Sequence, residues 1–140
     1  NISPKEMDTI LNKKSGLLGI SGVSSDARDI ENGIKEGNKR CILANKMYVR
    51  RIVDYIAKYY VELGGCDGIV FTAGVGENSV PVRRQVMEEL KVLGIYLDEE
   101  KNNIRGSLQR ISTNESSIKV YVIPTDEELM IARDTFELAR

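Results

Sequence analysis

The spacing of apolar residues along the chain predicts five helices. The longest periodic run covers residues 39–63, where one face is expected to be core and carries Ile42, Val49, Ile52, Val53, Ile56 and Tyr60. Shorter helices are predicted over residues 4–11, 27–35 and 80–93, and a last helix begins at Thr125. That last helix is expected to bury the side chains of Leu129, Met130, Ala132, Phe136 and Leu138.

Two unbroken apolar runs predict strands. Residues 69–71 (IVF) form a short run of the kind found in strands that are buried on both faces. Residues 119–123 (KVYVI) predict a second strand, which Pro124 ends. The remaining segments predict a short strand or edge segment over residues 94–97, an irregular or short extended segment over 17–23, and a polar loop over 98–117. This order of helices and strands is that of an α/β fold, with helices packed on a small sheet.

Both prominent polar clusters follow a predicted strand at its carboxyl end, where ligands bind in open α/β sheets. The first is the glycine segment 74–78 (GVGEN), and the helix after it would offer backbone N–H groups and a positive dipole end to an anion. By itself this signal is weak, because the Gly-Lys-Ser/Thr ending of a Walker loop is missing and Ser79 replaces the third glycine of a dinucleotide fingerprint. A strand-to-helix turn that binds nothing explains the segment equally well. Glu77 would repel a phosphate and suits a sugar or a base better.

Two helix starts carry the other candidate polar residues. Asp26 is expected to cap the helix over residues 27–35, and from these residues alone an ordinary capped start is favoured over a binding site. Thr125 and Glu128, three residues apart, predict a capping box, which would leave Asp126 and Glu127 free at the mouth of the last helix. Four arginines are interpreted as solvated residues on helix faces: Arg50, Arg51, Arg83 and Arg84.

Composition narrows the classes of function. The 140 residues are enough for one modest domain, and a formal net charge of −1 gives no basic surface for nucleic acid or an anionic membrane. No apolar stretch approaches the ~20 residues of a membrane span, and no signal peptide is expected. Cys41 and Cys66 lack metal-ligand spacing, which fits a reducing cytoplasm. The absence of histidine removes the commonest general base and transition-metal ligand.

Several segments resemble the acetate kinase family, a branch of the acetate/sugar kinase, actin and Hsp70 superfamily. They are DGIVFTAGVGENS followed by VRRQVMEELKVLGIYLD, then VIPTDEELMIARDT, with support from SGLLGISGVSSDARDI, and they come in the family's order. The resemblance implies a partial ribonuclease-H-like nucleotide-binding domain of the actin and Hsp70 type. Because the family's chains are much longer and this chain starts at Asn1 rather than Met, we expect residues 1–140 to be a fragment, a single domain from the carboxyl-terminal part of the family's second domain.

The resemblance also implies a reaction, in which the γ-phosphoryl group of ATP is transferred to acetate to give acetyl phosphate and ADP, with Mg²⁺ as cofactor. Its ATP-binding positions fall on Asp26, Ala27 and Arg28, which would contact adenosine, and on the loop Gly74, Val75, Gly76, Glu77 and Asn78. Glu127 matches the glutamate associated with magnesium. The family's catalytic arginines, its histidine and its first phosphate loop have no match here, so the 140-residue chain alone is expected to be inactive. The intact enzyme is expected to be a cytoplasmic homodimer without nucleic-acid or membrane partners.

Three alternatives stay open. A butyrate or propionate kinase shares the superfamily and the architecture, although the GVGEN and TDEEL stretches favour acetate kinase. A non-catalytic nucleotide-binding or sensing module would lack the same phosphoryl-contacting residues. The third alternative is a structural domain with no ligand, which titration with a nucleotide would distinguish.

Overall fold

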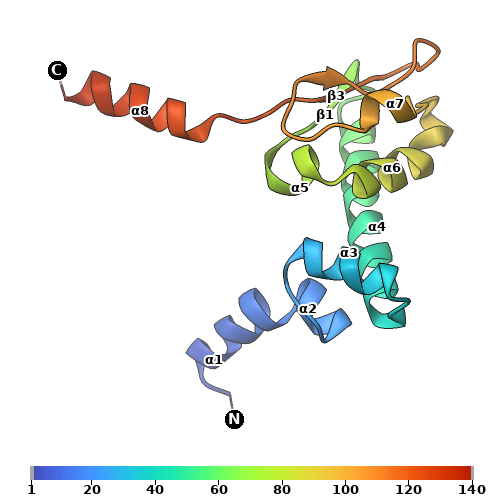
Figure 1. Cartoon of the computed structure of the whole chain (residues 1–140). Helices are drawn as coiled ribbons and strands as arrows, with labels where there is room; N and C mark the ends of the chain where they lie inside the picture. The colour runs from blue at the N-terminus through green and yellow to red at the C-terminus, as the bar shows by residue number, and fades with distance from the viewer. Residues whose placement is uncertain (1, 140) are drawn as a thin grey trace. The chain divides into compact units, whose positions relative to one another are not determined.

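The computed structural model describes residues 2–139 as a set of helices and one small sheet (Figure 1). The chain divides into two compact units, and the boundary between them lies between Glu62 and Leu63. Within the described residues no helix is both long enough and apolar enough to cross a membrane. The helices and the small sheet confirm the predicted α/β fold.

The first unit is helical, as its apolar spacing predicted. α1 (Pro4–Thr9) begins with a capping box in which Ser3 and Glu6 each accept a hydrogen bond from the other's backbone N–H. The π-helical turn η1 (Ile10–Lys14) continues it. Three further helices complete the unit, and the first two of them pack on the third: α2 (Gly16–Ser21), α3 (Ala27–Lys35) and α4 (Lys39–Glu62).

The helix α2 was not predicted, because residues 17–23 were expected to be irregular or extended. With six residues the helix is too short to show a helical repeat of apolar positions. It ends at Gly22, whose φ of 69° lies in the left-handed region that glycine adopts without strain. The Nε of Arg40 donates a hydrogen bond of 2.8 Å to the carbonyl of Ile20 and so satisfies the end of the helix.

Close packing of α3 on α4 sets the core at the start of the long helix. A Cβ atom added at Gly33 would lie only 2.5 Å from Sγ of Cys41, so only glycine fits at this crossing. Cys41 and Ala44 are both buried there. Ile42, which was expected to be core, is 44% exposed because its neighbour Cys41 occupies the buried side of the helix.

The second unit contains a three-stranded sheet in the order β1-β3-β2. β1 (Gly68–Phe71) pairs in parallel with the central strand β3 (Lys119–Val122), and β2 (Gln109–Arg110) pairs antiparallel on the other side. Both predicted strands are thus confirmed. The expectation that β1 is buried on both faces is wrong for this chain, because Val70 is 49% exposed. Three apolar residues in a row do not determine which faces of a strand are covered.

The helical layer of this unit follows β1. α5 (Ala73–Asn78) leads to α6 (Val80–Glu89) and the 3₁₀ turn η2 (Leu90–Leu93). Ser79 caps α6 by accepting a hydrogen bond from the backbone N–H of Val82, and Pro81 lies in the first turn as predicted. The buried apolar side chains of the unit come from these helices, the strands and their connections: Phe71, Val82, Val86, Met87, Leu90, Ile95, Ile111, Ile118, Val120 and Val122.

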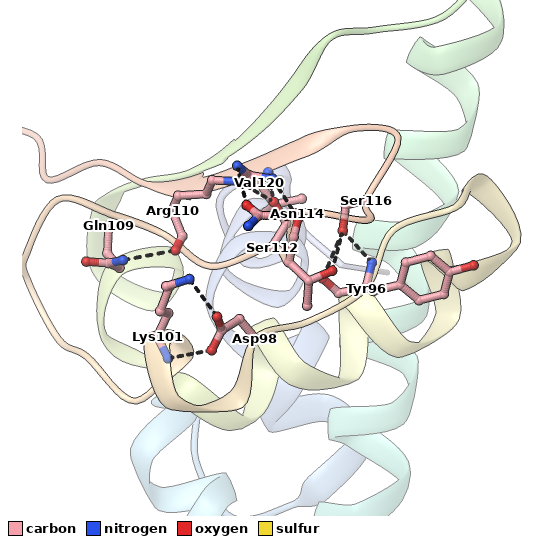
Figure 2. Close-up of polar contacts among 10 residues, drawn as sticks. Tyr96, Asp98, Lys101, Gln109, Arg110, Ser112, Asn114, Ser116 and Val120 are labelled. Atoms are coloured by element: carbon pink, nitrogen blue, oxygen red, sulfur yellow. Dashed lines mark hydrogen bonds and ion pairs between the residues drawn. The ribbon is translucent and has the colours of Figure 1, made fainter.

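The segment predicted as a polar loop, residues 98–117, contains more structure than expected. It includes α7 (Glu99–Asn102) and β2, and Leu97 forms an isolated bridge with Ser112. Figure 2 shows that Ser112 Oγ accepts hydrogen bonds from the backbone N–H of Val120 at 2.9 Å and from Arg110 at 3.2 Å. Polar side chains with no periodic spacing hold this segment, and for that reason its sequence predicts only a loop.

The last helix, α8 (Glu127–Leu138), has no buried residue. All five residues expected to form its core side are exposed in this chain, and Leu138 is 89% exposed. The apolar spacing predicted the helix correctly. It does not determine what covers the apolar side, and the expectation of a buried face is wrong for the described chain.

Candidate functional site

The parallel pairing of β1 and β3 brings the two predicted polar segments to one edge of the sheet. Phe71 at the end of β1 is the register partner of Val122, and its carbonyl accepts a hydrogen bond of 3.0 Å from the backbone N–H of Ile123. Beyond this point lies an open hollow of about 430 Å³, lined by Ala73, Gly74, Glu77, Thr125, Asp126, Glu127 and Glu128. The structure therefore brings predicted nucleotide residues together with the predicted magnesium residue.

The glycine segment 74–78 is helical rather than a loop, since it forms most of α5. The left-handed residue at the entry is Ala73, with a φ of 57°, and not one of the glycines. Gly76 packs closely on the end of β1, where a Cβ would make a tight contact of 3.3 Å with the carbonyl carbon of Phe71. Gly74 has open space around it and its carbonyl accepts a hydrogen bond of 2.9 Å from the Asn78 amide.

Glu77 joins α5 to the segment that leads into α8. Its Oε1 atom accepts hydrogen bonds from the backbone N–H of Thr125 at 2.9 Å and from the Thr125 hydroxyl at 3.0 Å. These bonds, the one from the backbone first, lower the pKa of Glu77 from its ordinary value, although desolvation acts in the opposite direction. The side chain that we expected to face a sugar or base thus has one carboxylate oxygen engaged by Thr125.

The cap of α8 differs from the predicted capping box. Asp126 is the capping residue, and its side chain accepts a hydrogen bond of 3.0 Å from the backbone N–H of Leu129. The backbone N–H of Thr125, which a capping box would direct to Glu128, instead donates to Glu77, a contact that local sequence does not reveal. The prediction that Thr125 and Glu128 form a box, with Asp126 free, is therefore wrong.

Glu127 is the first residue of α8, is exposed, and lines the hollow. Across residues 2–139 no group donates a hydrogen bond to its carboxylate, although the capping box that was expected to leave it free does not form. The role of Glu127 at magnesium stays a prediction. The part of the chain that the structure describes contains no group of three or more His, Cys, Asp or Glu residues able to hold a metal ion.

The other predicted nucleotide residues begin α3 in the first unit. Asp26 caps this helix, as predicted, by accepting a hydrogen bond of 2.8 Å from the backbone N–H of Arg28. The Arg28 guanidinium also pairs with the same carboxylate, at 2.6 Å, and the pKa of Asp26 falls to about 2, mainly through this side-chain bond. Ala27 is the first helical residue. The Arg28 side chain is 87% exposed, so its guanidinium offers an open face to a ligand.

Sequence reasoning missed Arg83, which was interpreted as a solvated residue. Arg83 is 0% exposed, whereas its neighbour Arg84 lies at the surface and pairs with Glu99 at 2.8 Å. A signal for its burial was present, since Arg83 stands three, four and seven residues before Val86, Met87 and Leu90, which form the buried stripe of this helix.

Comparison with known proteins places the chain in a family. The family model described as the acetokinase family matches residues 1–133. The chain belongs to the acetokinase family. A curated acetate kinase of Treponema denticola is 54% identical over 139 residues, covering 99% of this chain and 35% of its own length. The chain thus spans about a third of the length of the curated relatives it matches.

Solved structures agree with this family membership. The crystal structure of Porphyromonas gingivalis acetate kinase matches with a TM-score of 0.89 and 46% identity, over 99% of this chain and 35% of that one. A propionate kinase from Francisella tularensis matches with a TM-score of 0.83 and 36% identity, over 93% of this chain and 33% of that one. The fold is therefore shared by a protein named acetate kinase and one named propionate kinase.

Proposed function

We propose that this chain is the adenosine-binding part of an acetate kinase, which transfers the γ-phosphoryl group of ATP to acetate and forms acetyl phosphate and ADP. The observation that carries the proposal is the family match over residues 1–133, together with relatives named acetate kinase. The hollow at the carboxyl ends of two parallel strands supports it, because ligands of open α/β sheets bind at that edge.

The proposed adenosine contacts on α3 are Asp26, Ala27 and Arg28. A carboxylate suits the hydroxyls of a ribose, and a guanidinium can lie flat against a base. The ion pair between Asp26 and Arg28 is solvent-exposed, and water and salt screen such pairs so that they contribute little to stability. The two side chains can therefore exchange this contact for contacts with a nucleotide at little cost.

The second set of proposed nucleotide contacts is the α5 segment of Gly74, Val75, Gly76, Glu77 and Asn78. A Cβ atom added at Gly74 would meet no atom within 4 Å, so a ligand can approach the backbone closely there. Glu77 lines the hollow, and its Oε1 atom is engaged by Thr125.

Glu127 is proposed as the magnesium-side carboxylate. Mg²⁺ is commonly held by one or two carboxylates together with substrate phosphates and water, and Glu127, one of the exposed carboxylates that line the hollow, fits that pattern. When bound, the ion would neutralise charge on the phosphates of the nucleotide. The effect of Mg²⁺ on the affinity for ADP can be measured without catalysis. In Glu127→Ala, Mg²⁺ should strengthen ADP binding much less than in the original chain, whereas in Glu128→Ala the strengthening should be retained.

Titration of the purified chain with ATP and ADP, followed by calorimetry, tests the nucleotide proposal directly. Asp26→Ala should weaken binding clearly, and Asp54→Ala, which removes an acid from the exposed face of α4, should not. Because Asp26 also caps α3, binding is compared only between variants that are fully folded by circular dichroism. If the folded chain binds neither nucleotide, the structural domain without a ligand becomes the better interpretation.

The activity of a complete enzyme can be tested by exchange. The chain is substituted for the matching 35% of the Treponema denticola acetate kinase. Formation of acetyl phosphate is then measured with acetate as the acceptor, and formation of propionyl phosphate is measured with propionate. Propionate is included because a propionate kinase shares this fold. An exchanged protein that binds ATP but phosphorylates neither acid would favour the non-catalytic nucleotide-binding module.

From the family resemblance we also propose that the intact enzyme is a cytoplasmic homodimer. Measuring the mass of the intact enzyme in solution tests whether it is a dimer.

A further inference from the structure

Arg83 uses every N–H of its guanidinium group inside the second unit. Nε donates to the side-chain oxygen of Asn102 at 2.8 Å, Nη1 donates to the carbonyls of Gly76 and Glu77 at 2.9 and 2.8 Å, and Nη2 donates to the carbonyls of Asn102 and Ile104, both at 2.8 Å. Five donors thus meet five acceptors in a side chain that is 0% exposed.

Two of these acceptors lie at the carboxyl end of α5, where a helix leaves carbonyl groups without intrahelical partners. Gly76 and Glu77 belong to the segment proposed to contact the nucleotide. The positive charge of Arg83 also suits the negative end of the dipole of α5. The end of the glycine segment is therefore fixed by a side chain from the next helix.

The other acceptors connect Arg83 to Asn102, the last residue of α7, and to Ile104 just after it. Asn102 is also 0% exposed, and its amide nitrogen donates a hydrogen bond of 3.2 Å to the carbonyl of Val80 at the start of α6. Arg83 and Asn102 together join α5, α6 and the end of α7. These five acceptors of Arg83 are carbonyl or amide oxygens, so its charge is compensated by dipoles rather than by a carboxylate.

We propose that Arg83 is a positioning residue for nucleotide binding, which holds residues 74–78 in the arrangement that the nucleotide meets. This inference rests on the proposed function. It does not require Arg83 to touch the nucleotide. The hydrogen bonds from Thr125 to Glu77 extend the same constraint to the start of α8, so that Arg83 also helps to fix the separation of Gly74 and Glu127 across the hollow.

The substitution Arg83→Lys tests the inference because it keeps the positive charge. A lysine has three donors on one nitrogen and cannot reproduce the planar fork of five. Hydrogen exchange of the backbone amides in residues 74–78 should become about tenfold faster or more, as expected when hydrogen bonds are lost from this segment. ADP binding should weaken by about tenfold or more for the same reason.

Two matched controls separate positioning from general destabilisation. Arg84→Lys changes the adjacent arginine, which is at the surface, and should leave both measurements within about twofold of the original chain. Val86→Ala creates a cavity on the same helix without touching the carbonyls of α5. It should lower the free energy of unfolding while ADP affinity and exchange in residues 74–78 stay close to those of the original chain.

The outcomes are distinguishable. If Arg83→Lys binds ADP as well as the original chain, or leaves exchange in residues 74–78 unchanged, the inference is overturned. Should Arg83→Lys fail to fold, Asn102→Ala removes one of the five acceptors and should shift both measurements in the same direction by a smaller factor. If the original chain does not bind ADP, the proposed function fails, and the exchange measurement still decides whether Arg83 fixes this segment.

Discussion

The carboxylate of Glu77 accepts two hydrogen bonds from Thr125, one from the backbone N–H at 2.9 Å and one from the hydroxyl at 3.0 Å. Glu77 follows β1 and Thr125 follows β3, each within a few residues of the end of its strand. Their contact therefore connects the glycine segment with the start of α8. It also uses the Thr125 backbone N–H, which the predicted capping box would have directed to Glu128.

Replacing Glu77 with Gln should make the stability of the second unit less dependent on pH. The folded pKa of Glu77 is lowered, so its contribution is present above the unfolded pKa of about 4.3 and is lost as the pH falls through the lower folded value. Urea unfolding is measured between pH 3 and pH 7 at about one-unit steps. The Glu77→Gln chain should be less stable at neutral pH, and the difference should shrink in acid.

A control for this prediction is Glu36→Gln, which removes the same charge from the exposed end of α3. Its unfolding midpoint should follow that of the original chain across the range. Parallel curves for the original chain and Glu77→Gln would show that the bonds from Thr125 do not favour the ionised carboxylate.

Locally determined features were predictable from the sequence, and features set by distant residues were not. The caps at Asp26 and Ser79 and the two strands were predictable, because each depends on neighbouring residues. The cap of α8 was not, since Thr125 is engaged by Glu77 from another part of the chain. The same limit explains Val70 and Leu138, whose apolar character does not determine what covers them.

Arg83 and Arg84 show how far the burial of charged residues can be predicted from the sequence. Adjacent residues of one type lie in opposite environments, because a helix turns by about 100° from one residue to the next. The burial of Arg83 depends on five acceptors contributed by residues outside its own helix, four of them backbone carbonyls. Backbone acceptors leave no mark in the sequence, so only the periodic stripe could have indicated this residue.

The substitution Gly33→Ala should destabilise the first unit even though alanine favours helices. The added methyl would lie 2.5 Å from Sγ of the buried Cys41, and overpacking of this kind costs about 1–3 kcal/mol. The gain in helix propensity is at most about 1 kcal/mol. Urea unfolding should therefore show a lower midpoint for Gly33→Ala, and Cys41→Ala in the same chain should recover part of the loss.

Gly74→Ala serves as the comparison, because nothing lies within 4 Å of the position its methyl would occupy. This variant should unfold at the same urea concentration as the original chain or slightly higher. Equal stability of Gly33→Ala and the original chain would mean that α3 can move away from α4 without cost.

The substitution Asp126→Ala should loosen the first turn of α8 and leave global unfolding unchanged. Asp126 accepts the hydrogen bond from the N–H of Leu129, and such a cap contributes about 1 kcal/mol to its helix. Because no residue of α8 is buried, this loss acts on local opening. Amide exchange at Leu129 should become faster in Asp126→Ala, and the change should be smaller in Glu128→Ala. A larger change in Glu128→Ala than in Asp126→Ala would instead support the predicted capping box of Thr125 and Glu128.

The 140-residue chain by itself should not form acetyl phosphate. Phosphoryl transfer needs groups on the γ-phosphate, and the resemblance to the family gives no match in this chain for its catalytic arginines. Of the four arginines that the sequence placed on helix faces, Arg83 is buried, and the other three lie beside residues of their surroundings: Arg50 beside Asp54, Arg51 over the Tyr55 ring and Arg84 beside Glu99. One arginine acting on the transition state typically contributes a factor of about 10³ to 10⁵, so turnover without such groups should stay near background.

The assay for the isolated chain is acetyl phosphate formation from ATP, Mg²⁺ and acetate, with the Treponema denticola exchange protein as the active reference. Nucleotide binding by the same preparation shows that the chain is folded and that inactivity has a chemical cause. The salt-bridged arginines are the internal check, because neither Arg50→Ala nor Arg84→Ala should change the background rate. Turnover by the chain alone at roughly 1 to 100 per second, the range of ordinary kinases, would mean that these residues include catalytic groups that we have assigned to structure.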